Sequence, residues 1–137
     1  DGDVLFGDAL PPLALVHVRH LLVAFPDTPD NIGLTTGLLS QAKALNGYAQ
    51  EALAAQKFGD LVKLKLDAEA MVNLIEGKQG EHFGDVNGDG TVTSKPADDF
   101  GLLLNGENIG YIQGTIDHAG NAARGPMVFA TPSLSPP

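Results

Sequence analysis

The chain has 137 residues, which is long enough for one domain with a buried core. Acidic residues outnumber basic ones by 17 to 8, and the net charge of −9 argues against nucleic acid as a partner, because phosphate binding needs clustered lysine and arginine. The absence of cysteine excludes disulfide frameworks, thiolate metal sites, iron–sulfur clusters and cysteine nucleophiles.

The first predicted helix begins near Asp8 or the Pro11–Pro12 pair and ends before Pro26, since proline is tolerated in a first turn. Its sequence, LPPLALVHVRHLLVAF, is apolar on nearly every face, which is typical of a central helix or one shared between two interfaces. The stretch is too short to cross a bilayer, so no membrane span is expected. Arg19, surrounded by apolar residues, is expected to form a buried ion pair with an acidic residue of a later helix, such as Glu69.

The second helix is predicted from about Leu34 to Phe58. Its expected apolar stripe consists of Leu38, Ala42, Leu45, Ala49, Ala52 and Phe58. Gln41 lies off that stripe. Gly59–Asp60 predicts a helix stop followed by a new N-cap. A third helix then runs from residue 61 to a C-cap at Gly77.

The end of the chain combines a loop region, a helix and an arm. Residues 78–107 are expected to be irregular, and a fourth helix is predicted over about Glu107 to Arg124. Residues 126–137 contain too much proline and serine for a helix and are predicted to form an extended arm or linker. The sequence therefore predicts an all-α domain over residues 1–125, a bundle of about four helices with a long insertion before the last one.

The insertion contains the motif GDVNGDGTVT, which begins at residue 84. Four positions are predicted to supply oxygen ligands, the last through its backbone carbonyl: Asp85, Asn87, Asp89 and Thr91. Gly90 permits the tight turn, and Val92 is expected to pack the loop onto the core. Calcium takes six to eight oxygen ligands in a flexible geometry, so this spacing predicts a calcium site.

The segment from Gly84 to Leu104 resembles an EF-hand loop, and more closely the calcium loop of dockerin modules, in which D-x-N-x-D-G-x-[VI] leads into a helix. The resemblance implies cohesin-type recognition and extracellular assembly. Dockerin loops end with aspartate at position 12, where this chain has Pro96. Asp98 or Asp99, two and three residues later, is expected to close the ring instead, which gives a calcium loop over residues 85–99.

Histidines form a second group of candidate ligands. His17 and His20 are three residues apart on the first helix and share a face, and His118 lies on the fourth helix. Inward-facing histidines of a bundle can bind a transition metal or ligate a haem axially, and the alternative is that they hydrogen-bond within a packed interior. The Glu-x-x-His motif of di-iron bundles is absent, as is His-Glu-x-x-His.

No catalytic motif is present, whether G-x-S-x-G, a P-loop or G-x-G-x-x-G. We therefore expect a non-enzymatic, calcium-binding helical domain for protein–protein interaction or assembly, with a protein partner or self-association. The start at Asp1 without methionine favours a processed chain that is extracellular or periplasmic. The alternative is a metal- or haem-binding redox bundle that uses the three histidines. A small hydrolase with structural calcium is a third possibility, but the sequence names no nucleophile.

Overall fold

The computed structural model describes residues 12–103 and 109–124, and the regular structure within these ranges is entirely helical. Its elements are α1 (Pro12–Leu22), the short 3-10 helix η1 (Pro29–Asn31), α2 (Leu34–Phe58), α3 (Leu61–Glu76) and α4 (Tyr111–Arg124). The predicted all-α fold with four helices is confirmed. None of the helices in these ranges combines the length and the apolar character that a membrane crossing requires. The predicted arm at 126–137 lies outside the described residues.

Local capping signals set the boundaries of α2 and α3. Gly59 ends α2 in the left-handed conformation, with φ of 73°. The Asp60 side chain then caps α3 by accepting a hydrogen bond from the Lys63 amide at 3.0 Å. Gly77 is the C-cap of α3, as predicted. The fourth helix starts at Tyr111 rather than near residue 107, which lies outside the described ranges.

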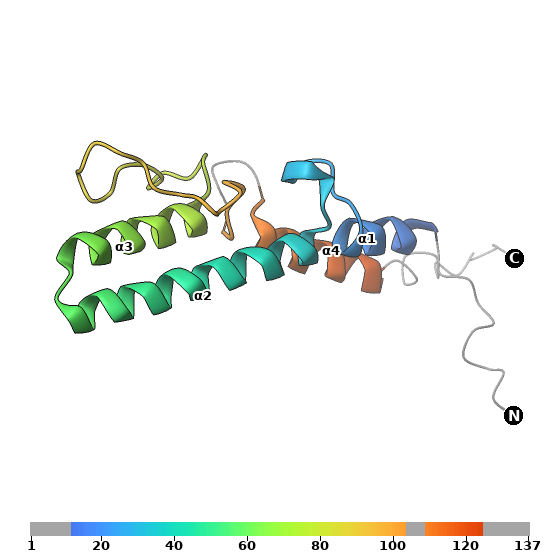
Figure 1. The fold of residues 1–137 in the computed structure, drawn as a ribbon. Helices are drawn as coiled ribbons and strands as arrows, with labels where there is room; N and C mark the ends of the chain where they lie inside the picture. The colour runs from blue at the N-terminus through green and yellow to red at the C-terminus, as the bar shows by residue number, and fades with distance from the viewer. Residues whose placement is uncertain (1–11, 104–108, 125–137) are drawn as a thin grey trace, which may run out of the picture.

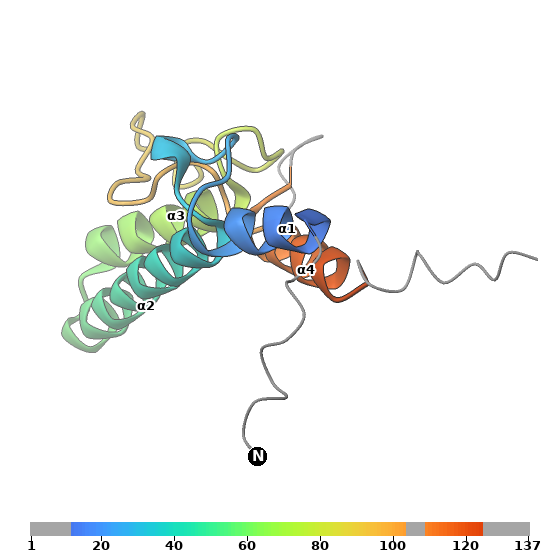
Figure 2. The same cartoon turned by 90° about the vertical axis from the view of Figure 1, so that its right-hand side faces the viewer.

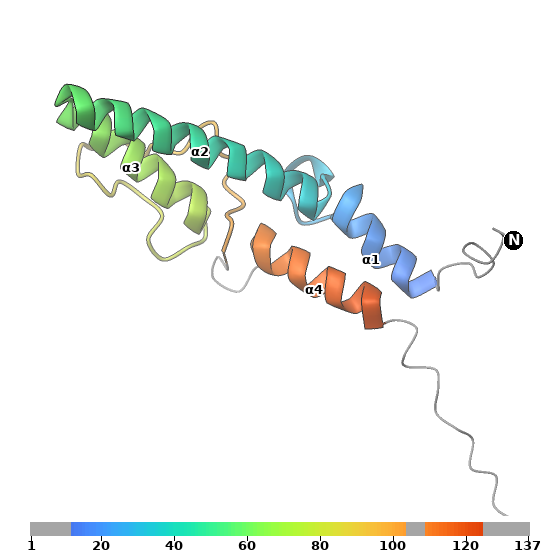
Figure 3. The same ribbon diagram turned by 90° about the horizontal axis from the view of Figure 1, so that it is seen from below.

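The long helix α2 is the central helix of the bundle and contacts all three other α-helices. Figure 1 shows α3 beside the C-terminal half of α2, while α1 and α4 lie together near its N-terminal end. Figure 3 shows the same two helix pairs from below, and Figure 2 shows α1 and α4 side by side. Because α3 contacts neither α1 nor α4, the bundle is elongated, with its two helix pairs offset along α2.

The core lies where the start of α4 meets α2 and the irregular segment before α4. Its buried apolar residues are Phe25, Leu34, Tyr48, Ala70, Leu74, Ala97, Leu102 and Tyr111. The first turn of α4 is held by backbone bonds, from the Tyr111 amide to the Gly101 carbonyl at 3.1 Å and from the Ile112 amide to the Leu102 carbonyl at 2.9 Å. The irregular segment is thus part of the core.

Two predicted helix faces are wrong in detail. On α2, Phe58 is 88% exposed, whereas Gln41 is only 4% exposed because its side chain accepts a hydrogen bond from the Asp98 amide at 3.3 Å. On α1 only Ala14 is buried, and large apolar side chains such as Leu13 and Leu22 face outward. The apolar surface of α1 is wider than its contacts with α2 and α4 can cover.

Candidate functional site

The predicted calcium loop lies beside α3 (Figure 1). Its turn is organised around the carboxylate of Asp85. Asp85 Oδ1 accepts hydrogen bonds from the amides of Gly88 at 2.7 Å and Asp89 at 3.1 Å, and its Oδ2 accepts one from Gly90 at 2.7 Å. Both glycines have positive φ, 76° and 88°, which residues with a side chain rarely adopt. The turn is therefore fixed by the carboxylate and by the two glycines.

Hydrogen bonds link the four predicted ligand positions of the loop to one another, and the Asp89 amide also donates to Asp85. Asn87 Oδ1 accepts a hydrogen bond from the Asp89 amide at 2.9 Å, and Asp89 Oδ1 accepts one from the Thr91 amide at 2.8 Å. A carboxylate has about four acceptor positions. Asp85 uses three of them on backbone amides, and Asp89 uses one on the Thr91 amide. Asp85 and Asp89 are both exposed. Oxygen atoms of this kind are the ligands that a hard cation such as calcium prefers.

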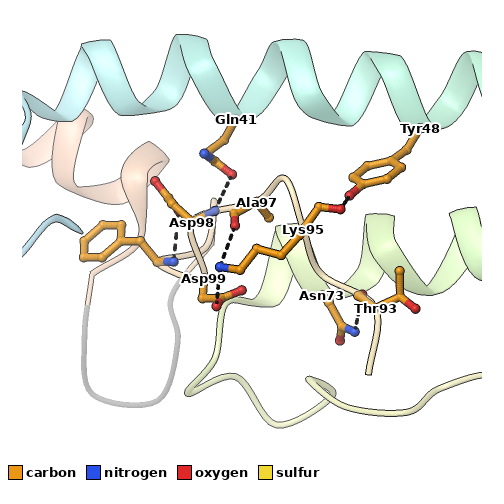
Figure 4. Close-up of polar contacts among 9 residues, drawn as sticks. Gln41, Tyr48, Asn73, Thr93, Lys95, Ala97, Asp98 and Asp99 are labelled. Carbon is orange, nitrogen blue, oxygen red and sulfur yellow. Dashed lines mark hydrogen bonds and ion pairs between the residues drawn. The ribbon is translucent and has the colours of Figure 1, made fainter. Parts of the chain in front are cut away.

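Two buried polar side chains of α3 hold the base of the loop. Glu69, only 1% exposed, accepts hydrogen bonds from the Asn87 amide at 2.9 Å and the Thr93 amide at 2.6 Å. Asn73, fully buried, donates to the carbonyls of Gly84 and Thr93 at 2.9 Å each. Its Oδ1 accepts from the Gly84 amide at 2.8 Å. Both ends of the loop are thereby attached to α3, and Figure 4 shows the bond between Asn73 and Thr93.

This docking corrects two predictions. Val92 is 49% exposed, so polar bonds rather than an apolar contact attach the loop. The ion pair between Arg19 and Glu69 is absent: Arg19 is exposed on α1, which does not contact α3. Sequence reasoning missed the role of Glu69 and Asn73, although two polar residues four apart beside an apolar stripe were an available signal.

The structure places Asp98 between α2 and α4 (Figure 4). Its Oδ2 accepts a hydrogen bond from the Tyr111 hydroxyl at 2.6 Å, and its Oδ1 accepts one from the Phe100 amide at 3.1 Å. Burial and the bond to Asp98 raise the pKa of the Tyr111 hydroxyl, which keeps it protonated as a donor. Asp98 thus ties the irregular segment to the first residue of α4.

Asp99 is also engaged away from the loop. It forms an ion pair with Lys95 at 3.1 Å, and Tyr48 of α2 donates a hydrogen bond to the Lys95 carbonyl (Figure 4). Among the described residues, neither Asp98 nor Asp99 joins other acidic or histidine side chains in a group of three within metal-ligand spacing. Asp98 and Asp99 are thus bonded to residues outside the 84–93 segment, and their role as closing ligands stays a prediction.

The three candidate histidines meet between α1 and α4. The Nδ1 atoms of His17 and His118 are 2.8 Å apart, and the ring centroids of His17 and His20 each lie 4.9 Å from that of His118. Among the described residues, this is the group of three whose potential ligand atoms all lie within 4.8 Å of one another. The ring of Phe25 packs against His20 and His118, with centroid distances of 5.3 and 5.2 Å.

The surroundings of His118 favour its neutral form. Burial, together with the neighbouring His20 and His17, lowers the pKa of His118. His20 Nδ1 is buried and makes no hydrogen bond. The fourth histidine, His82, lies elsewhere on the surface, 3.3 Å from Glu76.

Two separate arrangements can therefore hold a cation. The loop beside α3 offers oxygen atoms, which suit a hard ion, and the cluster between α1 and α4 offers imidazole nitrogens, which suit transition metals. No family model, curated protein or solved structure matches this chain, so its function has to be inferred from these contacts.

Proposed function

We propose that this chain is a non-enzymatic helical domain whose loop at residues 84–93 binds calcium, and that it serves in protein–protein interaction or assembly. The observation that carries the proposal is the attachment of the loop to α3 through buried Glu69 and Asn73. Because the loop is bonded to α3, an ion that orders the loop would also stabilise the folded bundle. Binding to the folded state alone stabilises that state by mass action.

The ligands that we assign are two carboxylates, one side-chain amide oxygen and one backbone carbonyl. They come from Asp85, Asn87, Asp89 and Thr91. Asp98 and Asp99 would first have to release Tyr111 and Lys95 to act as ligands. With two carboxylates, the site belongs with weak calcium sites, for which dissociation constants of about 10⁻⁴–10⁻³ M are typical of extracellular modules. An extracellular or periplasmic location agrees with this affinity.

Exposed apolar side chains support a role in interaction. Two groups lie at different places on the bundle, one on α1 and the residue that follows it, and one around the turn from α2 to α3. The exposed members are Leu13, Leu22 and Val23 in the first group and Phe58, Leu61 and Val62 in the second. Exposed apolar patches on soluble domains mark interaction sites.

Calcium titration of the chelated, full-length chain tests the proposal. We expect calorimetric binding heat and a rise of several degrees in the melting temperature when calcium is restored. Asp89→Asn keeps the shape of the side chain but removes one charge, and we expect it to weaken binding by about tenfold or more, equivalent to roughly 1.4 kcal/mol. Calorimetry and thermal melts measured by circular dichroism supply both readouts.

Asp27→Asn is the matched control, because it removes the same charge from an exposed residue outside the loop. It should bind calcium as the parent chain does. Absence of binding heat together with an unchanged melt, or equal affinity in the Asp89→Asn variant, would contradict the proposal.

A further inference from the structure

We propose that His17, His20 and His118 form a binding site for a divalent late-transition-metal ion such as zinc, separate from the calcium loop. The three imidazoles come from two helices, and their potential ligand atoms lie within 4.8 Å of one another. Tetrahedral zinc with Zn–N bonds of about 2.0–2.1 Å requires nitrogens about 3.3 Å apart. The His17 and His118 Nδ1 atoms, now 2.8 Å apart, would have to move slightly apart to reach that spacing.

The cluster is incompletely satisfied by protein groups alone. Two ring nitrogens, from His17 and His118, face each other at 2.8 Å and must share one proton. The buried Nδ1 of His20 has no partner, which is unfavourable for a polar atom removed from water. A metal ion placed among the three rings would give each of these nitrogens a ligand bond.

The donor atoms select the class of ion. The cluster contains no carboxylate, and the chain has no cysteine, so the site is made of imidazole nitrogens. Imidazole suits zinc, copper and nickel, whereas calcium prefers oxygen. Axial haem ligation would need two imidazoles on opposite faces of a porphyrin. Here the rings of His17 and His118 are in direct contact, which favours a single ion.

A cavity lies beside one member of the cluster. A cavity of about 450 Å³ borders His20 and is also lined by Val16, Arg19 and Asn31. Three protein ligands leave a fourth position of zinc for water or an external ligand. A bound ion would also link α1 to α4, because His17 lies on α1 and His118 lies on α4.

Titration of the metal-free, full-length chain with cobalt(II), followed by displacement with zinc, tests this site. We expect one ion per chain, the visible absorption bands of tetrahedral cobalt, and a rise in melting temperature of roughly 5–15 °C at a hundredfold excess of zinc over its dissociation constant. Alanine at His17, His20 or His118 should each weaken zinc binding by about 100-fold or more.

His82→Ala is the control, because this exposed histidine lies outside the cluster. It should bind zinc like the parent chain, and so should the loop variant Asp89→Asn in excess calcium, so that failure of the two sites can be told apart. Absence of cobalt bands, or undiminished zinc affinity in helical His118→Ala protein, would overturn the assignment.

Copper(II) electron paramagnetic resonance of the parent chain gives a readout that needs no variant. Nitrogen hyperfine splitting is the expected result, and coordination by oxygen alone would also overturn the assignment.

Discussion

Replacing Glu69 by alanine is expected to destabilise the domain by about 2–4 kcal/mol and to release the loop from α3. The carboxylate is buried and accepts two amide bonds, from Asn87 and Thr93. Hydrogen bonds to a charged group contribute about 1.5–3 kcal/mol each, and part of this is offset because the variant no longer buries a charge. Release of the loop should also weaken calcium binding.

The Glu69→Gln substitution removes the charge of the side chain but keeps its shape. Glu69→Gln keeps one acceptor oxygen, but its NH₂ group would face the second amide donor, so we expect a loss of about 1–3 kcal/mol. The matched control is Glu51→Gln, which removes the same charge from an exposed side chain that pairs with Lys63. An exposed ion pair of this kind contributes about 0–1 kcal/mol, so the control should change stability little.

Urea unfolding measures these losses, and native-state hydrogen exchange shows where they occur. In the Glu69→Ala variant the amides of Asn87 and Thr93 should exchange faster through local opening. Amides in the middle of α2 should exchange only through global unfolding, at the rate set by the stability of the whole domain. The docking role of Glu69 is wrong if both amides stay protected and stability falls no further than in the control.

The helix boundaries could be predicted because their causes are local. Gly59 is the C-cap of α2, Asp60 is the N-cap of α3, and Gly77 is the C-cap of α3. Each cap is formed by contacts within a few residues of the chain. The long α2 and its short turn into α3 follow from these signals. The start of α4 was harder to predict, since its first two residues are positioned by backbone bonds, from Tyr111 to Gly101 and from Ile112 to Leu102.

The polar residues that organise the loop could not be assigned from periodicity. Glu69 and Gln41 look like solvent-facing helix residues, and each is buried only because a distant, irregular segment returns to bond with it. The same reason explains Asp98. Its position after the loop suggested a calcium ligand, but the structure pairs it with Tyr111, a residue whose location depends on the packing of α4.

Only part of the histidine cluster could be predicted from the sequence. The spacing of His17 and His20 placed them on one face of a helix, and this is a local property. Their meeting with His118 depends on α1 packing against α4, which no local pattern encodes. The sequence could therefore supply the residues as candidates, and the tertiary structure supplies their juxtaposition.

Gly37→Ala is expected to cost about 2–4 kcal/mol, whereas Gly47→Ala in the same helix should stabilise the domain by up to about 1 kcal/mol. A Cβ atom on Gly37 would lie 2.0 Å from Cε1 of Tyr111, but at Gly47 it would meet nothing within 4 Å. Tyr111 is fully buried and bonded to Asp98, so its ring cannot move aside without breaking that bond.

Urea unfolding of the two alanine variants gives the comparison directly, because both substitutions raise the helix propensity of α2 by the same amount. Only the contact with Tyr111 differs. In a Tyr111→Leu background, which removes most of the ring, the penalty at Gly37 should shrink while the gain at Gly47 persists, and the difference is the coupling energy between the two positions. Equal effects of the two alanine substitutions in the parent chain would show that α4 does not pack on α2 through Tyr111.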